Sequence, residues 1–177
     1  MSASLATTAP GGPRTLPLLF LLAGASLLSG ALIIEHVGGI PPCILCVYQR
    51  FPPAIAAALG ALAAWPRLPT PWARGLTAVI GVVFLSGALL AGYHVGVEQH
   101  WWAGTEQCGG EGAPPPSLST NLSDLRSALD APEVVPCDAV PWSLFGISLA
   151  GYNMILSLGL ATLAAWAVRQ PACWRDR

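Results

Sequence analysis

The sequence predicts an all-α membrane protein, a bundle of four transmembrane helices. Of the 177 residues, 54% are hydrophobic and only 10% are charged, and lysine is absent. Because so few polar side chains cannot solvate a globular domain of this size, the bilayer is the expected solvent. Four apolar stretches are long enough to cross a hydrocarbon core of about 30 Å, which takes roughly 20 helical residues. We expect a single membrane domain over residues 16–168, with short tails at 1–15 and 169–177.

The first predicted helix covers Leu16–Ile34, a stretch without a charged residue. A cleaved signal peptide is the competing interpretation, because Arg14 precedes the apolar run and Ser29-Gly30-Ala31 offers small residues for cleavage. The run of about 19 residues exceeds the roughly 7 to 15 of a signal-peptide core. A retained helix is therefore favoured.

The second predicted helix runs from about Cys46 to Trp65. A start at Pro52 would give only about 14 apolar residues and about 21 Å, which is too short to span. Extension back to Cys46 gives about 20 residues and places this cysteine at the outer rim of the bilayer. The pair Pro52-Pro53 keeps the shorter helix open as an alternative, because proline fits only in the first turn of a helix.

The third and fourth predicted helices cover Gly75–Val97 and Ser143–Val168. His94 is the only ionisable side chain in the third, apart from tyrosine, and the fourth has no charge. The outer loops then span about residues 35–46 and 98–142, and we expect Glu35, His36, Glu98 and His100 to be solvated at their rims.

The long outer loop carries a predicted amphipathic helix from about Ser117 to Asp130. Leucines recur there at spacings of four, three and four residues, which places them on one face: Leu118, Leu122, Leu125 and Leu129. This helix either lies on the membrane surface or packs on the tops of the transmembrane helices.

The arginines predict the orientation. Six of the eight fall on one side of the predicted helices: Arg14, Arg67, Arg74, Arg169, Arg175 and Arg177. Arg50 and Arg126 fall on the other. Because basic residues tend to remain in the cytoplasm, we expect a multi-pass protein with both termini inside and its outer loops in the periplasm if the source is a Gram-negative bacterium. Cys43, Cys46, Cys108 and Cys137 then face an oxidising compartment, and Cys173 faces the reducing cytoplasm.

Cys43 and Cys46 form a C-x-x-C pair at the predicted rim. Such a pair closes a small disulfide or binds a metal, and its reactivity depends on the thiolate fraction. If the second helix begins at Cys46, Arg50 lies one turn later on the same face, where a guanidinium lowers the pKa of a thiol. A charge at this depth is expensive unless it has a partner. The alternative is an interfacial arginine whose charged end reaches back to water.

Cys108 and Cys137 lie in the same outer loop. A bond between them closes a loop of roughly 29 residues, which stabilises by about 3 to 4 kcal/mol in the chain-entropy model. The pair is either a structural disulfide or an accessible redox pair, and the adjacent Gly109-Gly110 and Pro114-Pro115-Pro116 favour the second. A four-cysteine zinc site is disfavoured, because a second C-x-x-C is missing and the compartment is oxidising. We expect no metal.

The segment Cys43-x-x-Cys46-x-x-Gln49-Arg50 after a first membrane helix resembles the disulfide bond formation protein B (DsbB) family, whose motif is C-x-x-C-x-x-[EQ]-R. The similarity continues in the second cysteine pair, in Tyr93-His94 at the end of the third helix, and in Trp142 followed by Gly146 at the opening of the fourth. This order of motifs differs from the vitamin K epoxide reductase family, where the C-x-x-C lies near the last core helix.

The resemblance implies a dithiol:quinone oxidoreductase. Such a protein reoxidises a periplasmic thioredoxin-fold dithiol protein (DsbA-like) and passes the electrons to a membrane quinone, ubiquinone or menaquinone. The roles it implies are: Cys108 as the target of the partner's thiolate, Cys137 as the attacker of Cys43, Cys46 as the released thiolate facing the quinone, Arg50 as its stabiliser, and His94 near the quinone ring. Gln49 replaces the glutamate of some members.

Two alternatives to this function stay open. A membrane scaffold would use both disulfides only to brace its loops. A specialised relative, such as a sulfotransferase-dedicated oxidase, would serve a different client. No feature of the sequence predicts a nucleic-acid partner.

Overall fold

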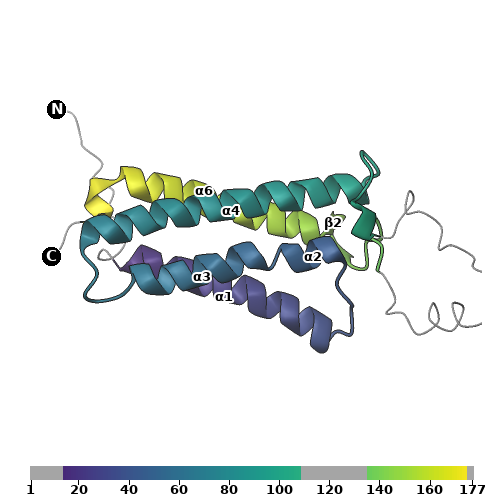
Figure 1. Ribbon diagram of the computed structural model, residues 1–177, viewed down its shortest axis with the longest axis horizontal. Helices are drawn as coiled ribbons and strands as arrows, with labels where there is room; N and C mark the ends of the chain where they lie inside the picture. Colours follow the sequence, from purple (N-terminus) through teal and green to yellow (C-terminus); the bar gives the residue numbers. More distant parts are fainter. Residues whose placement is uncertain (1–13, 109–134, 175–177) are drawn as a thin grey trace, which may run out of the picture.

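The computed structural model describes residues 14–108 and 135–174, and long helices dominate it (Figure 1). The helices are α1 (Thr15–His36), α2 (Ile44–Tyr48), α3 (Phe51–Ala63), α4 (Thr70–Glu98) and α6 (Leu149–Arg169), with the short 3-10 helices η1 (Glu106–Cys108) and η2 (Pro171–Trp174). Four spans of 22, 20, 29 and 21 residues are long and apolar enough to cross a membrane, α2 and α3 together forming the second. The predicted all-α, four-helix membrane architecture is therefore confirmed. The predicted loop helix from Ser117 to Asp130 lies outside the described residues.

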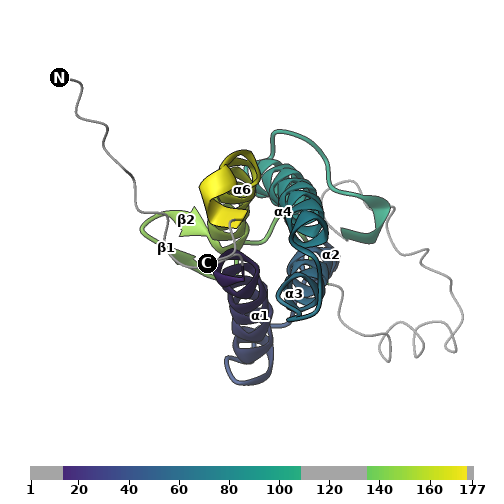
Figure 2. The same cartoon turned by 90° about the vertical axis from the view of Figure 1, so that its left-hand side faces the viewer.

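The helices pack in a sequential order. α1 packs against α3, α3 against α4 and α4 against α6, and Figure 2 shows these helices almost end on, arranged in an arc. Small residues allow the close approach of α1 and α3. A Cβ added at Gly24 would lie 2.5 Å from the Pro53 carbonyl oxygen, and one at Gly60 would lie 2.7 Å from the Leu21 nitrogen.

The two ends of the bundle differ in composition. The start of α1, the α3–α4 connection and the end of α6 lie together at one end (Figure 1). Arginines tie this end together: Arg14 Nη2 donates to the Pro66 carbonyl at 2.6 Å, and Arg74 Nε donates to the Val168 carbonyl at 2.8 Å. The opposite end holds α2, η1 and both cysteine pairs, Cys43/Cys46 and Cys108/Cys137.

The second span contains a break where the favoured prediction was one continuous helix and a start at Pro52 was the alternative. We expected one helix in which Cys46 and Arg50 are a turn apart, but α2 ends at Tyr48 and α3 begins at Phe51. Pro52 and Pro53 have no N–H to donate to the carbonyls one turn earlier, so the helical hydrogen bonding is interrupted there. Arg50 is the residue before α3, and the spacing argument for its contact with Cys46 fails.

The predicted bounds of the later helices also need correction. The fourth helix begins at Leu149 and not at Ser143, because a hairpin of β1 (Ser143–Leu144) and β2 (Ile147–Ser148) precedes it. Its turn is left-handed at Phe145 (φ 52°) and Gly146 (φ 77°), a conformation that glycine adopts without strain. The Ser148 hydroxyl then caps the helix by accepting from the Gly151 N–H at 3.1 Å.

α4 is longer than predicted. It begins at Thr70, more than a turn before the expected Gly75, and it has proline in its first turn. Proline is tolerated there, so Pro71 does not delay the helix.

Candidate redox site

The first cysteine pair lies at the start of the second span. Cys43 is the N-cap of α2, in an extended conformation, and its Sγ accepts from the Cys46 N–H at 3.3 Å. The Cys46 Sγ lies 2.9 Å away, and the two sulfurs are not bonded. Pro42 directly precedes this N-cap, and its ring fixes its own φ, which limits the conformations of the loop that leads into α2. The two thiols are thus held within reach of a disulfide.

The Cys43 thiol is strongly acidic. Its hydrogen bond with the Cys46 thiol is the main cause, and contacts with His94 and the Cys46 N–H add to it. Burial opposes these effects, but together they lower the pKa of Cys43 to about 4. This lowered pKa favours the thiolate of reduced Cys43, which is the nucleophilic form of cysteine.

The second cysteine pair is a closed disulfide. Cys108 and Cys137 are joined across a sequence separation of 29 residues, with their Cα atoms 5.1 Å apart. Both are buried, and they share one apolar cluster with Cys43, Leu45 and Val97. The expectation of an accessible pair with little core around it is wrong for these two side chains.

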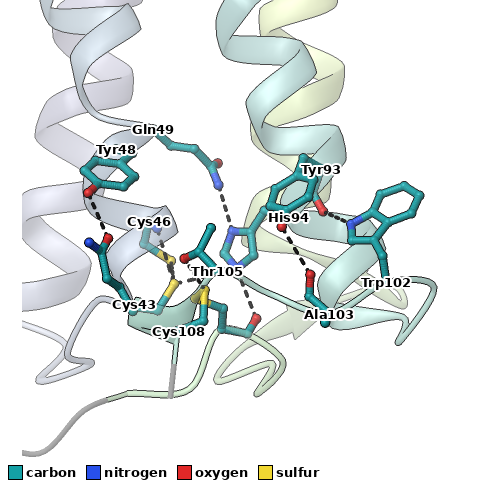
Figure 3. Close-up of a disulfide and its surroundings, with 12 residues drawn as sticks. Cys43, Cys46, Tyr48, Gln49, Tyr93, His94, Trp102, Ala103, Thr105 and Cys108 are labelled. Carbon is teal, nitrogen blue, oxygen red and sulfur yellow. Dashed lines mark hydrogen bonds between the residues drawn. A yellow bond between two sulfur atoms is a disulfide. The ribbon is translucent and has the colours of Figure 1, made fainter. Parts of the chain in front are cut away.

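His94 on α4 contacts both pairs. Its Nε2 lies 3.6 Å from Cys43 Sγ and 3.2 Å from the Cys137 carbonyl oxygen. Its Nδ1 lies 2.7 Å from Gln49 Nε2, on the opposite side of the ring. Figure 3 shows the imidazole between Gln49 and the sulfur atoms. The structure thus brings together Cys43, Cys46, Cys108, Cys137 and His94, which were predicted from the sequence.

Three of these residues also have the side chains of a metal site. The ligand atoms of Cys43, Cys46 and His94 lie within 4.8 Å of one another. Two sulfurs on a tetrahedral zinc ion would be about 3.8 Å apart, given a Zn–S bond of about 2.3 Å. The observed 2.9 Å between Sγ atoms is shorter and fits disulfide chemistry better.

A cavity of about 300 Å³ opens beside the first pair. All four spans contribute to its walls, which are mostly apolar and include Leu27, Ile34, Cys46, Arg50, His94 and Asn153. Buried ligands of drug size usually occupy cavities of roughly 300 to 1,000 Å³ with a few polar groups, so this one suits a small apolar molecule.

Comparison with known proteins agrees with this geometry. The sequence profile of the family described as "Disulfide bond formation protein DsbB" matches residues 13–167. The chain belongs to the DsbB family. It is therefore a multi-pass membrane protein of disulfide bond formation, and this is oxidoreductase chemistry.

Curated relatives of this DsbB family member carry the name "Disulfide bond formation protein B". The one from Methylococcus capsulatus (strain ATCC 33009 / NCIMB 11132 / Bath) is 32% identical over 158 residues, 85% of this chain and 91% of the relative. The one from Stutzerimonas stutzeri (strain A1501) is 28% identical over 164 residues, covering 87% and 93%. The one from Herminiimonas arsenicoxydans is 31% identical over 154 residues, covering 86% and 85%. No solved structure matches significantly.

Arg50 of the DsbB motif has an acidic partner. Its Nη1 lies 2.6 Å from Glu35 Oε2, an ion pair whose side chains are 20% and 27% exposed. The Arg50 Nε is buried and has no hydrogen-bond partner among the described residues. The expectation that Glu35 is merely solvated at the rim is wrong, because Glu35 neutralises the arginine beside the cavity.

Glu98 is a second acidic residue that is buried and not solvated at the rim as expected. It is 8% exposed, and its Oε2 accepts from the Ser148 hydroxyl at 2.5 Å. It lies one helical turn after His94, and this spacing was a signal that both could face the site. His36 and His100 are exposed, as expected.

Asn153 on α6 was missed altogether. Its Nδ2 donates to Gln49 Oε1 at 2.7 Å, which links α6 to the turn between α2 and α3. A strongly polar side chain within an apolar span is costly without a partner, and this was the available signal in the sequence.

Proposed function

We propose that this chain is a dithiol:quinone oxidoreductase, which reoxidises a periplasmic thioredoxin-fold dithiol protein and passes two electrons to a membrane quinone. The observation that carries the proposal is the contact of one side chain, His94, with both cysteine pairs beside an apolar cavity. A protein with two unrelated disulfides has no need of this convergence.

Electrons are proposed to enter at Cys108 and Cys137, which we call the outer pair. A thiolate of the partner attacks Cys108 Sγ, which breaks the Cys108–Cys137 bond and leaves Cys137 as a thiolate. The second thiol of the partner then displaces Cys108 and leaves the partner oxidised. The two electrons from the partner have now reduced the Cys108–Cys137 disulfide to two thiols.

Electrons are proposed to leave through Cys43 and Cys46, which we call the inner pair. The Cys137 thiolate attacks Cys43 in a Cys43–Cys46 disulfide, and Cys46 leaves as a thiolate. Cys108 then attacks Cys137, which restores the outer disulfide and releases Cys43. The structure has an intact outer disulfide and an unbonded inner pair, which is the arrangement at the end of this sequence.

The residues around the cavity fit a quinone. A bound quinone supplies an acceptor for two electrons and two protons, so that Cys43 and Cys46 can close again. The apolar walls would hold its ring, and the buried Arg50 Nε, which lacks a partner among the described residues, offers a hydrogen bond to an oxygen of such a molecule. Cys46 and His94 line the same cavity, so the sulfur that must be oxidised borders the proposed binding space.

The proposed location is the bacterial inner membrane, with both termini in the cytoplasm and the cysteine pairs in the periplasm. The concentration of arginines at the opposite end of the bundle supports this orientation. We further propose residues 16–168 as the membrane domain.

A scaffold with loop-bracing disulfides is the weaker alternative. The buried Cys108–Cys137 bond suits it. The unbonded Cys43 and Cys46, one of them with a strongly lowered pKa, do not, because a bracing disulfide is closed and inert.

The test is quinol formation by the purified chain. Reduced DsbA-like protein and ubiquinone, or menaquinone in a second arm, should together give quinol and oxidised partner in equal amounts. Replacement Cys46→Ser should abolish the reaction, and Cys173→Ser should not, because Cys173 lies at the opposite end of the bundle. Quinol formation by Cys46→Ser at the normal rate would refute the proposal.

A further inference from the structure

A chain of side-chain hydrogen bonds leads from α6 to the inner cysteine pair. Ser157 contacts Asn153 at 3.2 Å, Asn153 contacts Gln49 at 2.7 Å, and Gln49 contacts His94 at 2.7 Å. These four side chains come from α6, the α2–α3 turn and α4, so the chain crosses three parts of the bundle. Gln49, His94 and Ser157 are 7%, 2% and 2% exposed, so water has little access to most of it.

One atom at the end of the chain sets the direction of every bond. The Cys137 carbonyl oxygen can only accept a hydrogen bond, and it lies 3.2 Å from His94 Nε2. The proton of the neutral imidazole must therefore be on Nε2. His94 Nδ1 then carries a lone pair and needs a donor.

The amide groups follow from this assignment. Gln49 must present its NH₂ to His94 Nδ1, which turns its Oε1 toward Asn153. Asn153 must then present its own NH₂ to Gln49, which leaves its Oδ1 to accept from the Ser157 hydroxyl. When His94 is neutral, each group in the series donates toward it, and the orientation of each amide fixes that of the next.

We propose that Asn153 and Ser157 are positioning residues, which act through Gln49 to keep the proton of His94 on Nε2, facing Cys43. Among the described residues, neither hydrogen-bonds to a cysteine. Their effect is to hold one amide orientation, and through it one tautomer, on the other side of the imidazole.

The consequence for the chemistry rests on the proposed function. The outer disulfide must open during each cycle, and the Cys137 carbonyl then need not stay at His94. The amide chain would keep the Nε2 proton directed at Cys43 Sγ, 3.6 Å away, while Cys137 moves. Cys43 would thus keep a hydrogen-bond donor through the exchange.

Other titratable groups near His94 could also change the protonation of its ring. Cys43 and Cys46 face it from the start of the second span, and Glu98 lies one turn further along α4. The contributions of α6, Asn153 and Ser157, are neutral. A charge introduced at residue 153 therefore changes only the α6 side of this hydrogen-bond chain, which we call the relay.

The experiment is nitrogen NMR of histidine in the full chain, labelled with ¹⁵N-histidine and held in detergent micelles with the outer disulfide closed. The chain has three histidines. A His94→Asn sample assigns the His94 signals, and His36 and His100 serve as internal controls. At pH 8 the unsubstituted protein should show His94 Nε2 protonated and Nδ1 unprotonated.

The informative variant is Asn153→Asp. An ionised carboxylate accepts but does not donate, so it should turn the Gln49 NH₂ toward itself and the Gln49 oxygen toward His94. The His94 Nδ1 signal should then move from the unprotonated to the protonated range. Gln49→Glu, which places an acceptor directly at Nδ1, should give the same shift.

A double variant separates the relay from a plain charge effect. If the carboxylate introduced by Asn153→Asp acts through the amide of Gln49, the shift at Nδ1 should be lost in Gln49→Leu/Asn153→Asp. A shift that persists there would mean that the charge acts on His94 directly and would overturn the proposal. So would protonated Nδ1 in the unsubstituted protein, or an unchanged Nδ1 in both Asn153→Asp and Gln49→Glu.

This readout is independent of quinone reduction. If the unsubstituted chain reduces quinone but His94 is protonated on Nδ1, only the relay fails. If the NMR result holds but no quinol forms, only the proposed function fails.

Discussion

The two cysteine pairs have the same chemistry in different settings. Cys43 and Cys46 are separated by a single helical turn, and their unbonded sulfurs face a cavity between the spans. Cys108 and Cys137 are joined across 29 residues in a closed and buried bond. A long closed loop stabilises the chain, whereas a pair within one turn constrains almost nothing and is free to open and close. This difference is consistent with the roles proposed above, in which the Cys43/Cys46 pair reacts with a small acceptor and the Cys108/Cys137 pair exchanges with a protein.

The largest expected effect is the opposite behaviour of Cys108→Ser and Cys43→Ser in partner trapping and quinone reduction. Cys108→Ser should fail to trap a partner whose second thiol is replaced by serine, but its reduced inner pair should still reduce quinone in a single turnover. Cys43→Ser should trap the partner at Cys108 and give no quinol. Mass spectrometry of the trapped species and quinol absorbance measure the two outcomes. Quinol production by Cys43→Ser would remove the distinction between the pairs.

The second effect is on the ionisation of Cys43. In a Cys108→Ser/Cys137→Ser/Cys173→Ser background with the inner pair reduced, thiolate absorbance should persist at neutral pH and fall with a midpoint at about pH 4. The sign follows from the lowered pKa, because protonation at lower pH removes the thiolate. His94→Leu should move the midpoint upward, since one of the contacts that lowers the pKa of Cys43 is removed. A midpoint near the ordinary cysteine pKa of about 8.5 would contradict the proposed environment.

The third effect concerns the ion pair beside the cavity. Arg50→Ala should raise the apparent quinone KM and lower the free energy of unfolding by about 1 to 3 kcal/mol, because a partly buried Glu35 loses its partner. Glu35→Gln is the matched control: it removes the charge of the partner but keeps the guanidinium at the cavity. Steady-state kinetics should show a clearly smaller rise in KM for Glu35→Gln. Equal rises would mean that the pair acts only by holding α1 against the α2–α3 turn.

Much of the architecture was predictable from the sequence, because hydrophobic length depends on few variables. The count of apolar residues before Trp65 placed the second span correctly to within a turn of Ile44, and Cys43 and Cys46 at its start followed. The break before Pro52 was visible as an alternative, but the pattern could not decide between a broken and a continuous helix. The left-handed turn at Phe145 and Gly146 had only one glycine as a signal.

The contacts of the site were less predictable, because they depend on how the helices are rotated against each other. Gln49 and Asn153 are 104 residues apart in the chain, and nothing in either local pattern relates them. The same holds for Glu35 and Arg50, which meet only because α1 ends beside the α2–α3 turn. The motif identified which residues matter at the inner pair, and packing decided what they contact.

The smallest expected effect concerns the link between the two pairs. Tyr48 on α2 donates to Gln107 Oε1 in η1 at 3.2 Å, and this bond is exposed. Tyr48→Phe should lower the free energy of unfolding by about 1 kcal/mol or less, since an exposed hydrogen bond is partly replaced by water. Thermal unfolding checks this, and a loss of several kcal/mol would show that α2 and η1 depend on each other far more than the structure indicates.

The central claim is that the outer pair hands its electrons to the inner pair through a Cys137–Cys43 bond. The most direct measurement uses Cys46→Ser/Cys108→Ser, which leaves Cys43 and Cys137 as the only cysteines besides Cys173. After mild oxidation, peptide mass spectrometry should detect a Cys43–Cys137 disulfide within one chain, formed more readily than Cys43–Cys108 in Cys46→Ser/Cys137→Ser. Free thiols at both positions, or bonds only between chains, would contradict it.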